Sequence, residues 1–231
     1  MRTMKIRSLI HIAVLGIVAL IVIPGCETME DTYSQFSKVG ETLYIAKADS
    51  IKVRGGNYRI ELSWLLLSDP KIHSYKVYWN NRRDSIANSV VKTEGVDTVR
   101  LLLTNMREDV HNFDIYTFDK HGNSSVRAST VGRVYGDNYK GGLLNRTYKS
   151  LTRKGSDVIV QWSASDNTVL HVELNYLNSE NMMVSKRIPR SVEKDTLLKF
   201  PTGGTFNYRT AFLPEPAALD IFYSSERSVT F

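Results

Sequence analysis

Four histidines follow the N-terminal apolar segment, and they are the first candidates for acid–base or metal chemistry: His73, His111, His121 and His171. Histidine titrates near neutral pH and is a common metal ligand. The sequence places none of them in a catalytic or metal-binding motif, because it has no His-x-x-x-His pair, no Gly-x-Ser-x-Gly elbow, no phosphate-binding glycine loop and no calcium loop. We therefore expect no enzyme activity, no catalytic residue, no metal and no cofactor.

Two loops carry side chains suited to binding. The segment Trp79-Asn80-Asn81-Arg82-Arg83-Asp84 combines an aromatic ring, amides and guanidinium groups, which together can stack on a sugar ring or hold a carboxylate. The alternative is that Trp79 faces the core, since it shares the parity of Tyr75 and Val77, and that the rest is a solvated hairpin. The second loop is Leu213 to Tyr223, in which Phe222 and Tyr223 either contact a ligand or begin the final strand.

A third pattern concerns modification. Four times an aspartate precedes a serine or threonine and then an aliphatic residue, which resembles the acceptor for O-glycosylation in exported Bacteroidota proteins. The hydroxyl residues at these positions are Ser50, Ser85, Thr98 and Thr196. The same pattern is also a natural entry into a β-strand. Glycosylation of at least one of them is therefore a hypothesis beside this structural interpretation.

The N-terminus predicts where the protein works. Arg2, Lys5 and Arg7 precede an apolar run from Leu9 to Ile23, and Pro24-Gly25-Cys26 follows. This layout resembles a bacterial lipoprotein signal peptide at residues 1–25, with Cys26, the only cysteine, as the lipidated residue. An ordinary secretory signal and an uncleaved anchor are the alternatives, although the run is short for a membrane span. The membrane, reached through the lipid on Cys26, is thus the first expected partner.

The segment after Cys26 and the charge of the chain narrow the remaining partners. Glu27, Glu30 and Asp31 resemble, loosely, the signal that sends Bacteroidota lipoproteins to the outer face of the outer membrane. We therefore expect an outer-membrane, cell-surface location, with a periplasm-facing one as the alternative. The formal net charge of +6 includes three cations of the signal segment, and the remaining charges are interleaved rather than clustered. We expect no nucleic-acid partner.

The elements that must position these residues are β-strands. Short apolar runs alternate in period two and are separated by Gly, Asn, Asp and Pro, a pattern typical of an all-β protein. In the first half the expected strands are 58–64, 75–79, 98–103, 113–118 and 126–134. In the second half they are 157–162, 172–176, 197–200 and 206–212. No long helical period competes with this pattern.

The first half resembles a fibronectin type III domain. The resemblance rests on a strand that ends in Trp64, the following Tyr75-x-Val77 strand, and Phe113-x-Ile115 leading into a turn. Phe113 stands where such domains often carry the tyrosine of the corner motif, so that hydroxyl bond should be absent or supplied by Tyr116.

The second half repeats the scheme, since Trp162 lies 98 residues after Trp64, the spacing of one immunoglobulin-sized sandwich. We therefore predict a tether at 26–44 and two tandem immunoglobulin or fibronectin type III-like β-sandwiches at 45–137 and 138–231, with a linker near 136–142.

The whole chain after the signal segment is also similar to a family of Bacteroidota lipoproteins, a domain of unknown function. The shared stretches are Lys47-Ala-Asp-Ser50, Leu62-Ser-Trp64, Ser68-Asp-Pro70 and Val77-Tyr-Trp79-Asn80. This resemblance implies a location and no activity.

The sequence thus predicts a membrane-anchored, non-catalytic binding or adhesion module, with glycan capture at the cell surface as its role. The alternative is a structural spacer or scaffold for a protein partner of the cell envelope. In that case an edge strand, from 126–134 or 188–200, would add to the partner's sheet. A hydrolase is a distant third and would need histidines or carboxylates to meet in one cleft.

Overall fold

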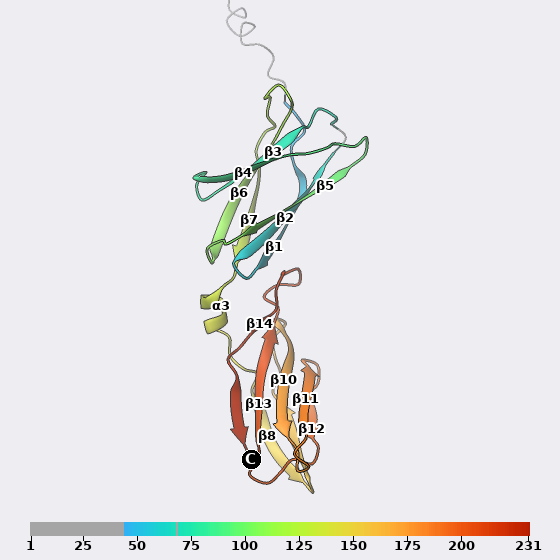
Figure 1. Ribbon diagram of the computed structural model, residues 1–231, viewed down its shortest axis with the longest axis vertical. Helices are drawn as coiled ribbons and strands as arrows, with labels where there is room; N and C mark the ends of the chain where they lie inside the picture. The colour runs from blue at the N-terminus through green and yellow to red at the C-terminus, as the bar shows by residue number, and fades with distance from the viewer. Residues whose placement is uncertain (1–43, 68) are drawn as a thin grey trace, which may run out of the picture. The chain divides into compact units, whose positions relative to one another are not determined.

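The computed structural model describes residues 44–67 and 69–231 (Figure 1). Within it, Tyr44–Phe231 form one compact unit. The predicted signal peptide at 1–25, Cys26 and all of the predicted tether except Tyr44 lie outside the described residues.

The first sandwich consists of two antiparallel sheets. One sheet has the strand order β1-β2-β5 and the other β4-β3-β6-β7. The bounds are Asp49–Gly56 for β1, Arg59–Leu66 for β2, Ser74–Trp79 for β3, Asp84–Ser89 for β4, Asp97–Thr104 for β5, Asp109–Phe118 for β6 and Ala128–Val134 for β7. Strand β2 is buried at every second residue, which is what period-two alternation predicts for a strand with one face on a core.

The second sandwich repeats this strand order. Its sheets are β8-β9-β12 and β11-β10-β13, with β14 and β15 both pairing with β13. The bounds are Tyr148–Lys154 for β8, Asp157–Trp162 for β9, Val169–Leu177 for β10, Met183–Pro189 for β11, Lys194–Leu197 for β12, Thr205–Phe212 for β13, Phe222–Tyr223 for β14 and Arg227–Thr230 for β15. The short helix α3, Asp137–Gly141, lies in the chain between the two sandwiches. The chain is therefore all-β, with two tandem fibronectin type III-like sandwiches, as predicted.

Each sandwich packs around one tryptophan. Trp64 is 1% exposed and meets Tyr75 edge to face at 4.9 Å between ring centroids. Trp162 is fully buried and meets Tyr208 at 5.4 Å. Aromatic pairs at such separations contribute about 0.5–1.5 kcal/mol beyond their buried area.

A buried threonine and serine recur at equivalent places in the two sandwiches. The Thr117 backbone N–H donates to Ser125 Oγ, and the Thr210 backbone N–H donates to Ser224 Oγ. Each threonine hydroxyl also holds the segment that enters its sandwich. Thr117 Oγ1 donates to the Ala46 carbonyl, and Thr210 Oγ1 accepts from the Arg146 backbone N–H.

Two expectations for local structure need correction, the strand at 197–200 and the continuous edge at 188–200. The apolar stretch 197–200 was expected to be a strand, but β12 ends at Leu197 and Lys199 adopts a positive φ of 50°. Leu197 is buried as the last residue of β12 and Phe200 is buried after a turn, so the burial of Phe200 did not require an extended strand there. The candidate edge at 188–200 is likewise divided between β11 and β12. For the corner hydroxyl bond the structure agrees with the first of the two predicted outcomes, its absence, because Phe113 is fully buried and the Tyr116 hydroxyl accepts a hydrogen bond from Arg82 instead.

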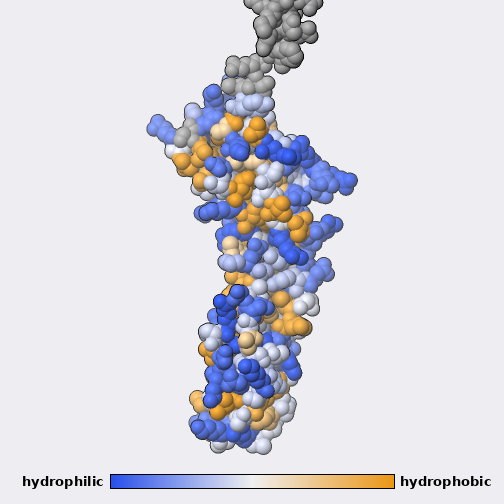
Figure 2. All heavy atoms as spheres, turned by 180° about the vertical axis from the view of Figure 1, so that it is seen from behind, coloured by the Kyte–Doolittle hydropathy of each residue, from blue (hydrophilic) through white to orange (hydrophobic). Residues whose placement is uncertain are grey.

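The surface does not present one continuous apolar band on the face that Figure 2 displays, where hydrophobic residues lie scattered among hydrophilic ones. None of the helices in the described part of the chain is long and apolar enough to cross a membrane.

Candidate functional site

A groove of about 440 Å³ lies beside the β3–β4 hairpin, where the sequence predicted ligand contacts. We call it the hairpin groove. The hairpin lines it with Trp79, Asn80, Asn81 and Asp84, and the opposite wall runs from Asn105 to Asn112. Trp79 is half-buried, packs against the first core and also lines the groove. The two interpretations of Trp79 are therefore compatible, because its ring can contact both.

The hairpin turns through an unusual backbone. Asn80, Asn81 and Arg82 have successive positive φ values of 49°, 53° and 63°. Asparagine tolerates this left-handed region better than most residues, whereas for arginine it costs roughly 1–2 kcal/mol. Asn105 on the opposite wall also has a positive φ, of 55°. This geometry holds several amide side chains at the rim, exposed to solvent.

The polar groups of the groove are only partly engaged with one another. Asn80 Nδ2 donates to Asp84 Oδ2 at 3.0 Å, and His111 Nε2 lies 2.8 Å from the Arg107 carbonyl oxygen. Within the described residues, the side chains of Asn81 and Asn112 make no hydrogen bond. An amide offers a donor pair and an acceptor side by side, so these groups can bind hydroxyls or other amides.

A second surface adjoins this groove, on the outward side of the sheet β4-β3-β6-β7. Tyr78 on β3 and Tyr116 on β6 are half-buried and meet edge to face at 6.0 Å. Arg82 lies 5.7 Å and 5.5 Å from their two ring centroids, and Lys76 Nζ lies 4.8 Å from Tyr78.

One carboxylate lies among these cations. Asp114 accepts from Arg82 at 3.3 Å and from Ser129 Oγ at 2.8 Å, and Arg127 is 3.8 Å away. We call this surface the tyrosine–arginine face and define it by six residues: Lys76, Tyr78, Arg82, Asp114, Tyr116 and Arg127.

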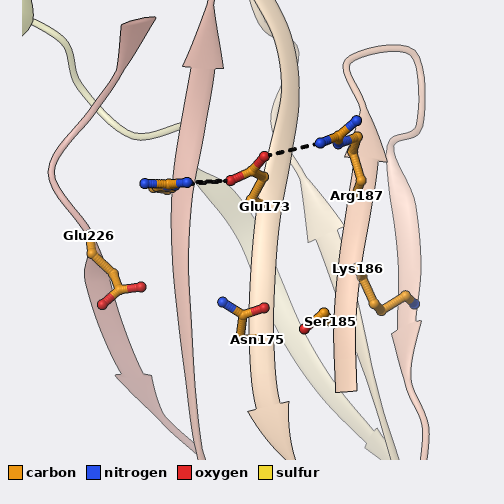
Figure 3. A pocket seen from close by; sticks show the side chains of 7 residues that line it. Glu173, Asn175, Ser185, Lys186, Arg187 and Glu226 are labelled. Carbon is orange, nitrogen blue, oxygen red and sulfur yellow. Dashed lines mark hydrogen bonds and ion pairs between the residues drawn. The ribbon is translucent and has the colours of Figure 1, made fainter. Parts of the chain in front are cut away.

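A charged hollow of about 610 Å³ lies on the corresponding sheet of the second sandwich (Figure 3). Glu173 on β10 lies between Arg187 on β11, at 3.4 Å, and Arg209 on β13, at 2.8 Å. Burial raises the pKa of Glu173, but hydrogen bonds from Arg209 and His171 outweigh it, and the net shift is downward. Glu226 and Lys186 also line the hollow, and Lys186 pairs with Asp195 at 2.6 Å, so three cations are balanced by three carboxylates. We interpret this network as a cross-strand support of the sheet.

The C-terminal part of the second predicted loop packs against the first sandwich, whereas Leu213, Pro214, Glu215 and Pro216 line a hollow of about 450 Å³. Phe222 is 1% exposed and contacts Tyr139 at 5.1 Å and Tyr135 at 5.7 Å between ring centroids. A ligand cannot reach it, so the proposed contact at Phe222 is not supported. Tyr223 is half-buried, with the Arg209 guanidinium 4.1 Å from its ring centroid.

Polar contacts accompany this apolar packing. We call the contact region between the two sandwiches the joint and define it by Gly55, Asn57, Arg59, Tyr135, Tyr139, Leu219, Asp220 and Phe222. Asp220 accepts from Arg59 Nε at 2.9 Å and from the Asn57 backbone N–H at 2.7 Å. The hydrogen bond from Arg59 lowers the pKa of the Asp220 carboxyl, against an opposing effect of burial. The Leu219 N–H donates to the Gly55 carbonyl at 2.7 Å. The strand end is glycine here because a Cβ at Gly55 would overlap the backbone of β7.

The linker is fixed to the same end of the first sandwich. Glu108, which lies in the segment that forms the far wall of the groove, accepts from the backbone N–H groups of Asn138 and Tyr139 at 2.8 Å and 2.7 Å. Tyr135 donates to Glu215 at 3.0 Å, and burial followed by this carboxylate raises the pKa of Tyr135 to about 12.

The structure distributes the other sequence candidates over the surface. Arg82 and Arg83 are exposed, but Arg82 points to the tyrosines rather than into the hairpin groove. Ser50, Ser85 and Thr98 are exposed, whereas Thr196 is half-buried.

The histidines do not converge. His111 lies in the hairpin groove and His171 beside Glu173, while His73 and His121 are exposed. Among the described residues, no three metal-binding side chains gather at one place.

The sequence analysis missed the tyrosine–arginine face and the far wall of the groove. The signal for the face was present, because period-two alternation puts Lys76 and Tyr78 opposite to the buried Val77. What the sequence did not disclose is that β6 lies next to β3, which brings Tyr116 to Tyr78.

The chain belongs to the DUF4998 family, described as a domain of unknown function, whose model matches residues 26–222. No curated protein matches its sequence significantly.

Two chicken structures are similar in fold. The crystal structure of the CNTN1 FN1–FN3 domains is 10% identical, with a TM-score of 0.42, and the match covers 80% of this chain and 64% of that one. A two-domain fibronectin type III segment from tenascin is 11% identical, with a TM-score of 0.33, and the match covers 80% and 99%. The fold assignment itself rests on the strand order of this chain.

Proposed function

We propose that this member of the family is a lipid-anchored, non-catalytic binding module that captures glycan in the hairpin groove. The observation that carries the proposal is the lining of that groove, where the Trp79 side chain and several amides surround one hollow. Sugars present apolar ring faces beside hydroxyl groups, and this combination of aromatic and amide side chains complements both.

The anchor is part of the proposal. Lipidation at Cys26 would hold the chain at the outer membrane, with the cell surface as the proposed side and the periplasm as the alternative. The proposal of processing at Cys26 rests on the sequence, where a basic start and an apolar run precede Pro24-Gly25-Cys26. Two or three acyl chains suffice for stable attachment without a membrane-spanning element.

Tryptophan fluorescence gives a direct test, because the chain has three tryptophans and only Trp79 is accessible. Trp64 and Trp162 are 1% and 0% exposed. The full-length chain, purified in detergent, would be titrated with maltoheptaose, cellohexaose and a xylan oligosaccharide, and a shift in emission would report occupancy of the groove. Trp79→Phe should abolish the signal while calorimetry still detects binding.

Asparagine variants identify the contacts. Asn112→Ala and Asn105→Gly each remove one amide, and glycine keeps the positive φ at position 105. Each should weaken binding about two- to tenfold, the value of one net hydrogen bond. Asn138→Ala, an exposed asparagine on α3, is the matched control. If no oligosaccharide alters Trp79 emission or produces heat, the proposed function is wrong.

The joint supports a second candidate, the spacer. The aromatic contacts of Phe222, the Arg59–Asp220 pair and the Leu219 backbone bond oppose bending between the sandwiches. A spacer would keep its role in cells when the groove amides are removed, whereas a glycan-binding module would bind glycan more weakly. The Asn112 variant therefore distinguishes the two candidates.

A further inference from the structure

We propose that the tyrosine–arginine face binds the carboxylate or sulfate groups of an acidic glycan. This inference takes the class of polymer from the proposed function, but it rests on different residues. The first argument is charge. Three cations, Lys76, Arg82 and Arg127, surround the single carboxylate Asp114, which leaves a net charge of +2.

The cations are also incompletely paired. Asp114 is shared by Arg82 and Arg127, and the longer of the two contacts is 3.8 Å. Lys76 has no ion-pair partner within the described residues, and its ammonium group lies over the Tyr78 ring. The side chain of Arg82 is 53% exposed and that of Arg127 60% exposed, so an incoming anion can reach both.

The second argument is the pair of aromatic rings. Tyrosine and arginine are enriched among the residues that contribute most to binding energy, and tyrosine offers a large contact area with little loss of conformational entropy. The strands that carry the two tyrosines, β3 and β6, correspond to β10 and β13 of the second sandwich. There, at the positions equivalent to Tyr78 and Tyr116, the chain has Asn175 and Arg209. The outward tyrosines are therefore not a requirement of the fold.

The third argument is continuity with the groove. Strand β6 carries Asn112, a residue of the hairpin groove, on the same outward side as Asp114 and Tyr116, because they alternate with the buried Phe113 and Ile115. A polymer seated in the groove can thus extend along β6 onto the charged face. Its acidic groups would meet Arg82 and Lys76, while its neutral rings would lie over the tyrosines.

The test compares acidic and neutral probes on the full-length chain in detergent. The probes are a heparin dodecasaccharide, a labelled oligogalacturonate, maltoheptaose and a poly-glutamate peptide, measured by fluorescence anisotropy at 50 mM and 200 mM salt. We expect the two acidic glycans to bind more tightly than maltoheptaose, and the difference to shrink at high salt because screening weakens exposed charge pairs.

The decisive variant replaces the three cations of the face by glutamine. Its control replaces three exposed cations elsewhere, so that both proteins lose the same charge; the control positions are Lys71, Arg100 and Lys120. Each exposed ion pair contributes roughly two- to fivefold in affinity, so the face variant should bind oligogalacturonate about ten- to a hundredfold more weakly. The control should stay within about threefold. Arg82→Gln alone provides an intermediate step if the triple variant is unstable.

The outcomes separate this inference from the proposed function. Equal losses in the two triple variants, or no loss in either, would overturn the inference. Equally tight binding of poly-glutamate would overturn the assignment to glycans. Binding of maltoheptaose alone, lost in the Asn112 variant, would leave the groove intact as a glycan site and refute the charged face.

Discussion

The joint yields the sharpest prediction for stability, through Asp220. Replacing it by alanine removes an acceptor that serves Arg59 Nε at 2.9 Å and the Asn57 N–H at 2.7 Å. A hydrogen bond to a charged group contributes about 1.5–3 kcal/mol when buried. The side chains of Arg59 and Asp220 are 40% and 23% exposed, so solvent screening reduces this value. We expect Asp220→Ala to lower the free energy of unfolding by about 2 kcal/mol.

Differential scanning calorimetry measures the effect. A loss of 1 kcal/mol shifts the melting temperature by about 2–4 °C in a domain of 150–250 residues, so Asp220→Ala should melt about 4–8 °C lower. The transition should also broaden or divide, because the two sandwiches would no longer unfold together. Glu94→Gln removes a carboxylate at an exposed loop and is the control. A melting temperature equal to that of the control, with one undivided transition, would refute the argument.

The same carboxylate predicts a pH dependence. Its pKa is lowered in the folded state, chiefly by the hydrogen bond from Arg59. A lowered carboxyl pKa stabilises the fold at pH values above the unfolded pKa of roughly 4, and this contribution is lost as the pH falls through the folded pKa. The difference between the wild type and Asp220→Ala should therefore be full at pH 6 and shrink steadily below pH 4. A difference that stays constant down to pH 2 would contradict an electrostatic origin.

Two further predictions concern the repeated threonine and the anchor. Thr210→Val leaves the buried Arg146 N–H without its acceptor, and it should lower the free energy of unfolding in urea by about 1–3 kcal/mol. Thr117→Val should have the same effect in the first sandwich. The control, Thr98→Val on the surface, should change the free energy of unfolding by less than about 0.5 kcal/mol. Cys26→Ser should move the chain from the membrane fraction to the soluble fraction, and protease added to intact cells should digest the wild type if it lies outside. Retention of the serine variant in the membrane would contradict lipid anchoring.

The fold was predictable because its signals are local. Alternation of buried and exposed residues in β2 and β9 marks strands, and the repeated tryptophans mark two copies of one sandwich. Of the strands that were missed, β4 and β8 show little of that pattern. One residue of β4 and three residues of β8 are half-buried and the rest are exposed, since an edge strand needs little apolar surface. Their existence follows only from their hydrogen-bonded neighbours.

Only one of the two walls of the hairpin groove could be predicted from the sequence. The composition of the hairpin from Trp79 to Asp84 indicates a binding site, but the opposite wall of the groove comes from residues about 25 positions later in the chain. The burial of Phe222 illustrates the same limit, because it depends on Tyr135 and Tyr139, more than 80 residues away. Contacts of this kind are set by how the sheets and the joint come together, and no local pattern encodes them.

The two sandwiches differ in their outward side chains, and this difference helps to decide whether the chain is a glycan-binding module or a structural spacer. Both retain the buried tryptophan and the threonine–serine pair that their shared strand order requires. A spacer needs these cores and a stiff joint, and it makes no demand on outward side chains. In the second sandwich the outward charges around Glu173 balance one another. In the first, Tyr78, Tyr116 and unbalanced cations lie beside a groove of free amides. On our proposal the first sandwich therefore binds, and the joint fixes the direction in which its groove is presented.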